Sequence, residues 1–440
     1  GLLADLKLGY RFSITLGGIL MGIGYCMLAI PETWAFYAAL GIMVVGNGFF
    51  KPNISTLLGN IYNTEELRPL KDNAYNIFYM GINGGAFFAP LVCGYLGENI
   101  DFKWGFFSAG IGMIIALIIF YYTKDKYVVS PTGVQLGVEP NKLKDAAPVD
   151  GSKSGFSNSQ IIALIVSIVA AISIIHLVLK VDFWGSLIYG MTLVAPFVVI
   201  TDKSLTKVEK DRLWVIILVM IFVVFFWMCF EQAGASLTFF ADEQTNRHIF
   251  GLEIPASYFQ SFNAGFIILL APILTMIWLK LGKKGKNPAA PYKQSLGLAF
   301  LALGYLVIAF GSKNIPPLGA SIFWLTGLYF LHTIGELCLS PIGLSMVNKL
   351  TPMRFTSLMM GTWFLANAAA NKFAGTLSAL IPPGAGEEPA AAGAAIPSFM
   401  GIEISNLFVF FCVFIVLSGA ASLILLALFR KIIKMMHGVN

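Results

Sequence analysis

Residues 48–59 read GFFKPNISTLLG, which places Lys51 and Pro52 side by side inside a long apolar segment. A lysine at the centre of a membrane helix costs about 2.5–3.5 kcal/mol on insertion scales, so it requires a partner or an aqueous cavity. A proline removes one backbone hydrogen bond and bends a helix. This stretch therefore predicts a distorted membrane helix that lines a cavity.

The composition of the chain predicts a membrane protein. The 440 residues are 57% hydrophobic and only 12% charged, whereas about 25% of the residues in a soluble domain are charged. Apolar runs recur that are long enough to cross roughly 30 Å of hydrocarbon. We expect an all-α polytopic membrane protein with twelve spans, near residues 11–30, 33–60, 72–97, 102–122, 158–179, 183–200, 212–240, 256–281, 290–311, 319–348, 354–381 and 403–429.

The placement of the basic residues explains the formal net charge of +6. With these spans, only four of the 29 Lys and Arg residues fall in loops opposite the termini: Lys103, Lys180, Arg247 and Lys313. Because positively charged loops tend to stay in the cytoplasm, both termini of this chain are expected there. The basic residues therefore require no nucleic-acid partner.

The sequence indicates neither catalysis nor metal binding. Its five cysteines fall inside the spans without metal-ligand spacing, and they are most simply packed thiols. We find no Ser/His/Asp set, HExxH motif or phosphate-binding glycine loop. We therefore predict a protein that is not an enzyme and that uses no cofactor or metal.

An internal repeat predicts two related halves. Residues 46–52 and residues 335–341 each begin with Gly and end with Pro, and they are 289 residues apart. Residues 79–86 and 363–370 each place an aromatic residue four positions before an Asn, followed by small residues, at an offset of 284. That spacing puts the aromatic ring and the amide on one helix face. Two features thus agree on one duplication.

The repeat predicts how the chain is organised. We expect an N-terminal half, a cytoplasmic linker, an inserted helix pair, a cytoplasmic loop and a six-helix C-terminal half, at residues 1–122, 123–157, 158–200, 201–211 and 212–440. One span precedes the first copy of the repeat, whereas three precede the second copy within its half. The first half is therefore expected to hold four of six helices. Two parallel six-helix halves form the major facilitator architecture, whose substrate site lies between the halves.

Four ionisable residues fall well inside the spans: Lys51, Glu231, Glu336 and Lys372. Lys51 and Glu336 lie on repeat-related helices, so their opposite charges could face one another across a central cavity. They form either a static ion pair or a site for a ligand or proton. Lys372 either reaches an acceptor such as Glu231 or extends to the membrane surface.

Glu231 lies in the aromatic stretch FFWMCFEQAGASLTFFAD, residues 225–242. A carboxyl group in such a poorly hydrated site is expected to exchange a proton near neutral pH. The alternative is a neutral Glu231 that is hydrogen-bonded to a neighbouring helix.

Other polar and aromatic residues of the spans are weaker candidates. Asn83, Asn263 and Asn367 offer both a donor and an acceptor and could orient peptide-like amides, although packing hydrogen bonds explain them nearly as well. Trp363 and Phe364 could form the apolar wall of a pocket, or they could simply pack.

Four motifs resemble a known family. GNGFFKPNISTLLG, FYMGINGGAFFAP, FEQAGASLTFFAD and GELCLSPIGLSMVNKLTP are similar, in order and spacing, to signatures of the proton-dependent oligopeptide transporter family of the major facilitator superfamily. The opening GLLADLKLGYR resembles the superfamily loop motif between the second and third helices. This loop motif comprises Gly1, Asp5, Gly9 and Arg11.

The resemblance implies roles for matching positions. Lys51 would bind the peptide carboxylate and take part in coupling, and Glu231 would be the protonation site. Glu336 would receive the peptide amino terminus. Asn83 and Asn263 would contact the peptide backbone and terminus, while Trp363 and Phe364 would line the side-chain pocket. Tyr79 and Asn367, which the repeat relates to these positions, complete the expected substrate site.

The chain departs from the family at its start. The first-helix E-x-x-E-R motif, which is tied to proton coupling, has no counterpart because no such helix precedes Gly1. The chain is therefore expected to be either a truncated form that lacks the first two helices or a degenerate member of the family. We expect that the chain as given does not perform proton-coupled uptake, whereas the full-length form does.

The resemblance implies import of di- and tripeptides, driven by protons, through alternating access. The alternatives are a transporter of another small solute and a non-transporting peptide-binding membrane sensor. A monomer in the bacterial inner (plasma) membrane is expected, with the lipid bilayer, peptides and protons as partners.

Overall fold

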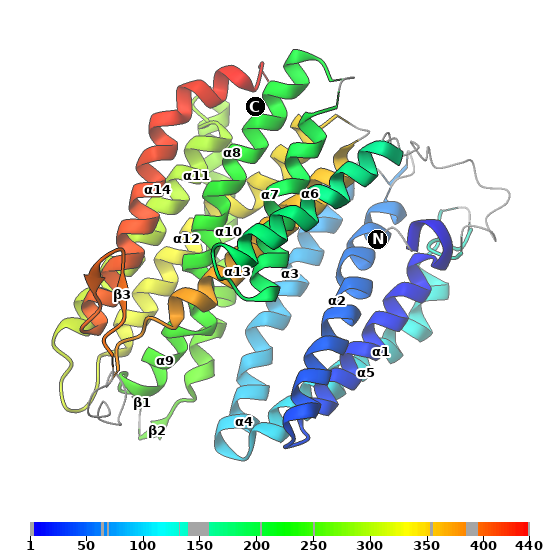
Figure 1. The fold of residues 1–440 in the computed structure, drawn as a ribbon. Coiled ribbons are helices and arrows are strands. Elements are labelled where there is room, and N and C mark those ends of the chain that lie inside the picture. The colour runs from blue at the N-terminus through cyan, green and yellow to red at the C-terminus, as the bar shows by residue number, and fades with distance from the viewer. Residues whose placement is uncertain are drawn as a thin grey trace. The chain divides into compact units, whose positions relative to one another are not determined.

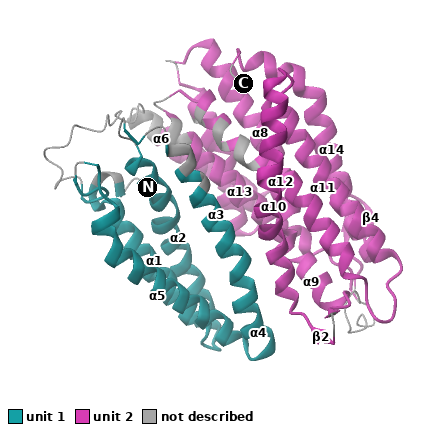
Figure 2. Ribbon diagram, turned by 180° about the vertical axis from the view of Figure 1, so that it is seen from behind, with its two compact units in different colours: residues 1–150 teal, residues 151–440 magenta. Residues whose placement is uncertain are grey.

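The structure of the chain is a computed structural model, drawn in Figure 1. It describes residues 4–62, 66–67, 70–131, 133–139, 158–202, 205–249, 251–352, 355–383 and 395–438. The chain divides into two compact units, residues 1–150 and residues 151–440, which Figure 2 colours separately. Most of the predicted linker 123–157 and part of the loop after residue 383 lie outside the described residues.

The first unit is helical, apart from one isolated β-bridge near its end. A short π-helical turn at Ala4–Leu8 leads into α1, and α1 packs against α2 and α5. A π-helical turn at Pro90–Gly94 joins α3 to α4, where proline cannot donate a helical hydrogen bond. The helices are α1 (Tyr10–Leu28), α2 (Thr33–Ile61), α3 (Lys71–Ala89), α4 (Tyr95–Asn99) and α5 (Phe102–Tyr127).

The second unit holds the remaining helices and two short hairpins. Its helices are α6 (Asn158–Leu177), α7 (Phe183–Ile200), α8 (Lys207–Phe230), α9 (Ser236–Glu243), α10 (Gln260–Lys283), α11 (Ala290–Lys313), α12 (Ile322–Leu350), α13 (Thr356–Ser378) and α14 (Leu407–Met435). Strands β1 (His248–Ile249) and β2 (Leu252–Glu253) pair antiparallel, as do β3 (Ser398–Phe399) and β4 (Ile402–Glu403).

The predicted span 212–240 is not one continuous helix. α8 begins at a capping box formed by Thr206 and Glu209, and it ends at Phe230. A 3₁₀ turn at Glu231–Gly234 then separates α8 from α9. The chain therefore changes its helical geometry at the predicted protonation site, which the apolar pattern alone did not reveal.

The core of the second unit lies around α8, α11, α12 and α14, and aromatic rings fill much of it. Tyr305 is fully buried, and its ring stacks on Phe414 with centroids 4.8 Å apart. Its hydroxyl donates to the Cys229 carbonyl at 2.5 Å, so the buried phenol is satisfied. This hydrogen bond joins α11 to the end of α8.

Glycines at matching places allow close helix crossings in both units. A methyl group at Gly46 of α2 would lie 2.9 Å from the carbonyl oxygen of Gly17 in α1. A methyl group at Gly335 of α12 would lie 2.7 Å from the carbonyl oxygen of Gly297 in α11. Small residues let membrane helices approach this closely. The glycines that begin the two repeat copies thus occupy equivalent helix crossings.

A helix covers most of each of the twelve predicted spans. Among the described residues, nine helical segments are long and apolar enough to cross a membrane, and Ile162–Leu177 and Phe183–Phe197 are shorter apolar helices. α13 belongs to neither group, and it carries Asn367, Asn371 and Lys372. The prediction of an all-α, multi-pass fold is confirmed.

Candidate functional site

Glu336 is the centre of a polar cluster in the second unit. Its side chain is on α12, and the residue is only 8% exposed. Nδ2 of Asn263, from α10, donates to Oε2 of Glu336 at 2.9 Å and to Oγ1 of Thr333 at 3.1 Å. Thr333 in turn donates to the Tyr329 carbonyl at 2.7 Å. The two predicted residues therefore meet, and Thr333 helps to fix the amide that orients the carboxylate.

Glu231 lies in the 3₁₀ turn between α8 and α9. It interacts electrostatically with Glu336, so both predicted acidic residues belong to one region of the second unit. Two carboxylates that interact in this way respond to each other's protonation state.

Gln232, which the sequence analysis did not single out, holds this turn in place. The residue is fully buried, and its Nε2 donates to the Ala374 carbonyl of α13 at 2.9 Å. Ser236 donates to Oε1 of Gln232 at 2.6 Å. The amide thus bridges the broken helix to α13 and fixes the backbone beside Glu231.

α13 carries three predicted residues in different environments. Trp363 is 4% exposed, and its ring packs directly over Gly343 of α12, where a side chain would overlap it. Phe364 is 55% exposed. The Oδ1 atom of Asn367 is buried without a hydrogen-bond partner in the described structure. Asn367 therefore has a free acceptor, Phe364 has an accessible ring, and Trp363 is held by helix packing.

The first unit carries the other predicted binding residues. Lys51 and Pro52 are exposed on α2, in contrast to the buried Glu336. Tyr79 of α3 is 36% exposed. Asn83 is 6% exposed, and its Nδ2 donates to the Tyr79 carbonyl at 2.9 Å, which leaves its oxygen to accept from a ligand or neighbour.

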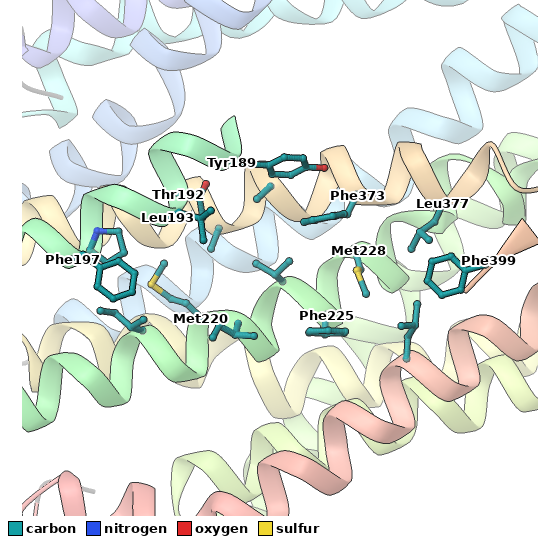
Figure 3. Close-up of a pocket in the computed structure, with 17 residues that line it drawn as sticks. Tyr189, Thr192, Leu193, Phe197, Met220, Phe225, Met228, Phe373, Leu377 and Phe399 are labelled. Atoms are coloured by element: carbon teal, nitrogen blue, oxygen red, sulfur yellow. The ribbon is translucent and has the colours of Figure 1, made fainter. Parts of the chain in front are cut away.

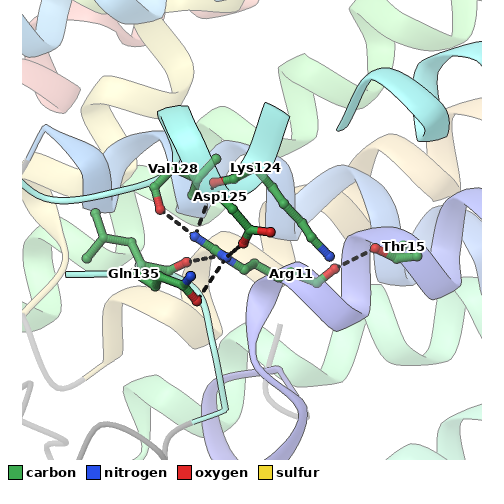
Figure 4. A network of polar contacts seen from close by, with 7 residues as sticks. Arg11, Thr15, Lys124, Asp125, Val128 and Gln135 are labelled. Atoms are coloured by element: carbon green, nitrogen blue, oxygen red, sulfur yellow. Dashed lines mark hydrogen bonds and ion pairs between the residues drawn. The ribbon is translucent and has the colours of Figure 1, made fainter. Parts of the chain in front are cut away.

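The loop motif around Arg11 forms a dense network within the first unit (Figure 4). Arg11 is 7% exposed and forms an ion pair with Asp125 at the end of α5. The guanidinium also donates to the Gln135 side chain and to three carbonyl oxygens, those of Lys124, Val128 and Leu136. A guanidinium has five N–H donors, so this fork suits an arginine better than a lysine. Arg11 thereby fixes the segment after α5.

The other motif positions are placed as follows. Gly9 has a positive φ of 73°, and a methyl group there would lie 2.6 Å from the Val138 carbonyl carbon. Only glycine fits this conformation and this contact. Asp5 lies in the π-helical turn Ala4–Leu8, and Gly1 lies outside the described residues.

Lys372 has a partner that the sequence analysis did not name. Its Nζ lies 2.7 Å from Oδ2 of Asp182, which caps the N-terminus of α7, so the acceptor is Asp182 and not Glu231. The hydrogen bond from Lys372 lowers the pKa of the Asp182 carboxyl, and the backbone N–H of Gly185 lowers it further. The inserted pair is therefore tied to α13, and a ring stack of Tyr189 on Phe373 accompanies this ion pair, with centroids 4.5 Å apart.

Comparison with known proteins identifies the family. A model of the POT family matches residues 11–390. An uncharacterized transporter, YclF, of Bacillus subtilis is 36% identical over 375 residues, which cover 84% of this chain and 73% of that protein. Peptide transporter YePEPT of Yersinia enterocolitica is 34% identical over 397 residues, covering 86% and 75%. A di-/tripeptide transporter of Lactococcus lactis is 32% identical over 381 residues, covering 84% and 74%.

A solved structure supports the same assignment. The crystal structure of a mutant of peptide transporter POT in complex with alafosfalin matches with a TM-score of 0.78 at 30% identity, covering 100% of this chain and 83% of that one. The fold is thus the major facilitator fold of these transporters. As its motifs predict, this multi-pass membrane protein belongs to the POT family.

Proposed function

We propose that this protein is a symporter that imports di- and tripeptides together with protons by alternating access. One observation carries the proposal: a buried carboxylate, Glu336, is oriented by Asn263 and interacts with a second carboxylate, Glu231. Membership of the POT family supports it, as do the names of its relatives in Yersinia enterocolitica and Lactococcus lactis.

Glu336 supplies the anionic end of the proposed peptide site. A zwitterionic peptide needs an anion for its amino terminus and a cation for its carboxylate, and charge-assisted hydrogen bonds are the strongest contacts available to it. Lys51 supplies the cation. Recognition of both termini leaves the side chains free to vary, which suits a transporter of many different peptides.

Amides and aromatic rings complete the proposed site. Asn83, Asn263 and Asn367 bind the peptide backbone, because the oxygen of each amide can accept a hydrogen bond from a peptide N–H. Peptide side chains contact Trp363, Phe364 and Tyr79.

Glu231 is the proposed proton carrier. It lies in the 3₁₀ turn where α8 ends, and Gln232 links this turn to α13, so a change in the charge of Glu231 acts next to the contact between α8 and α13. Lys51 takes part in the coupling through the peptide carboxylate. The proposed protein is a monomer in the bacterial inner membrane, and its two termini in this chain face the cytoplasm.

The test is uptake of a labelled dipeptide into proteoliposomes that contain the purified protein. An inward proton gradient is expected to drive accumulation, and unlabelled di- and tripeptides are expected to compete, whereas free amino acids compete poorly. Glu231→Gln is expected to abolish gradient-driven accumulation but to preserve peptide binding. Glu243→Gln, at the end of α9, serves as the matched control.

Two outcomes would contradict the proposal. Accumulation that peptides fail to inhibit would indicate another small solute. Peptide binding without any uptake would indicate a membrane sensor.

A further inference from the structure

An apolar cavity of about 500 Å³ lies within the second unit, between α7, α8, α13 and α14 (Figure 3). Its size is that of a pocket for a small organic molecule. Its lining is almost entirely aliphatic, aromatic and thioether side chains. Thr192 is an exception, but its hydroxyl already contacts the carbonyls of Ile188 and Leu365. The cavity therefore presents little that a polar ligand could bind.

The cavity opens to the outside of the bundle. Leu193 and Phe197 of α7 and Ile221 of α8 line it, yet they are 56%, 43% and 53% exposed. α8 is one of the helices long and apolar enough to span a membrane. In a bilayer, the apolar side chains that α7 and α8 leave exposed are expected to meet hydrocarbon. A peptide segment would leave its backbone amides unsatisfied here, whereas an alkyl chain would not.

Two lysines lie near the start of α8, before the residues of that helix that line the cavity. Trp214 of α8 packs edge-on against Phe197, with ring centroids 5.6 Å apart. Lys210 is four residues before Trp214 and eleven before Ile221, so it lies on the same helix face, about 6 Å beyond the indole along the axis. Lys207 is one turn further, and neither lysine has an ion-pair partner in the described part of the chain.

We infer that this cavity binds one acyl chain of an anionic membrane phospholipid, whose phosphate contacts Lys207 and Lys210. The chain lies between α7 and the helices α8 and α13, alongside Leu193 and Ile221. The Asp182–Lys372 ion pair ties α7 to α13, and the bound lipid fills the space that the helices leave open. The lipid thus joins the inserted pair to the rest of the unit.

Native mass spectrometry of the purified protein tests this inference, with phosphatidylglycerol and phosphatidylcholine of identical acyl chains as probes. Phosphatidylglycerol is expected to bind more tightly. The double variant Lys207→Gln/Lys210→Gln is expected to lose about 30-fold in affinity for phosphatidylglycerol, from the attraction of two lysines for an anionic lipid, and to keep its affinity for phosphatidylcholine. Lys431→Gln/Lys434→Gln, at the exposed end of α14, is the control and is expected to bind as the wild type does.

Filling the cavity tests the acyl-chain site separately. Leu193→Trp and Ile221→Trp each place bulk into open space, so both variants are expected to fold and to lose binding of both lipids by about tenfold or more. Leu423→Trp on α14, which is 68% exposed and does not line the cavity, is the control. Equal lipid binding by the filled variants and this control, or equal binding of the two lipids by wild type, would overturn the inference.

Discussion

Glu336→Gln gives the sharpest test of ligand recognition. The substitution keeps the shape of the side chain and an oxygen that can accept the 2.9 Å hydrogen bond from Asn263, so the polar cluster is expected to persist. It removes the negative charge and replaces one carboxylate oxygen with an NH₂ group. If Glu336 binds the peptide amino terminus, the loss of binding affinity is confined to ligands that carry an ammonium group.

The structure sets the size of the effect. Glu336 is 8% exposed, so solvent screens its contacts weakly. A hydrogen bond to a charged group contributes about 1.5–3 kcal/mol. Since each 1.4 kcal/mol is a factor of ten, Glu336→Gln is expected to raise the dipeptide Kd by about 10-fold to 150-fold.

Calorimetric binding measurements on wild type and variant, each with a dipeptide and with its analogue that lacks the amino group, form a double-mutant cycle. The analogue is expected to bind both proteins within about twofold, because it has no ammonium group to lose. Glu403→Gln, on the exposed strand β4, controls for the removal of one negative charge. Equal weakening of the two ligands would refute the assignment of Glu336 to the amino terminus.

Three further predictions concern packing and charge. Gly335→Ala is expected to destabilise the protein by about 1–3 kcal/mol because its methyl group meets the backbone of α11. Gly361→Ala, with open space around it, is expected to be neutral or slightly stabilising. Equal melting temperatures of the two variants would contradict this prediction. Arg11→Lys is expected to speed amide hydrogen exchange of residues 128–136 by about tenfold or more, because one ammonium group cannot replace the several hydrogen bonds of the Arg11 guanidinium. Unchanged exchange would contradict this role of Arg11. Lys372 depresses the pKa of Asp182 in the folded protein. The ionised carboxylate therefore stabilises the fold above the usual Asp pKa of about 3.9, and this stabilisation is lost as the pH falls through the lower folded-state pKa. The melting-temperature difference between wild type and Asp182→Asn is expected to be constant near neutral pH and to shrink below about pH 4, and a difference that grows on acidification would contradict the ion pair.

Much of the fold could be predicted from hydrophobicity and from small residues. Membrane helices are recognisable as long apolar runs, and a helix covers most of each of the twelve predicted spans. The Gly46 and Gly335 positions were recognisable as a repeat because close helix crossings admit only glycine at the contact. The break at Glu231 was not predictable from hydrophobicity, because the apolar residues on either side of it are compatible with a straight helix and with a broken one.

The residues of the proposed site could be selected from the sequence, but their contacts could not. Glu336 and Asn263 stood out as polar groups inside spans, and the structure joins them. Asp182 did not stand out, because a carboxylate in a loop is ordinary until the fold brings Lys372 beside it from 190 residues away. Gln232 and Thr333 were missed for a related reason: their importance lies in the partners they reach on other helices.

A structure of the protein with a bound dipeptide tests the central claim most directly. We predict that the peptide amino nitrogen lies within about 3.2 Å of the Glu336 carboxylate and that the peptide carboxylate lies within about 4 Å of the Lys51 ammonium. A peptide bound in the reverse direction, or at a site that includes neither residue, would contradict the account.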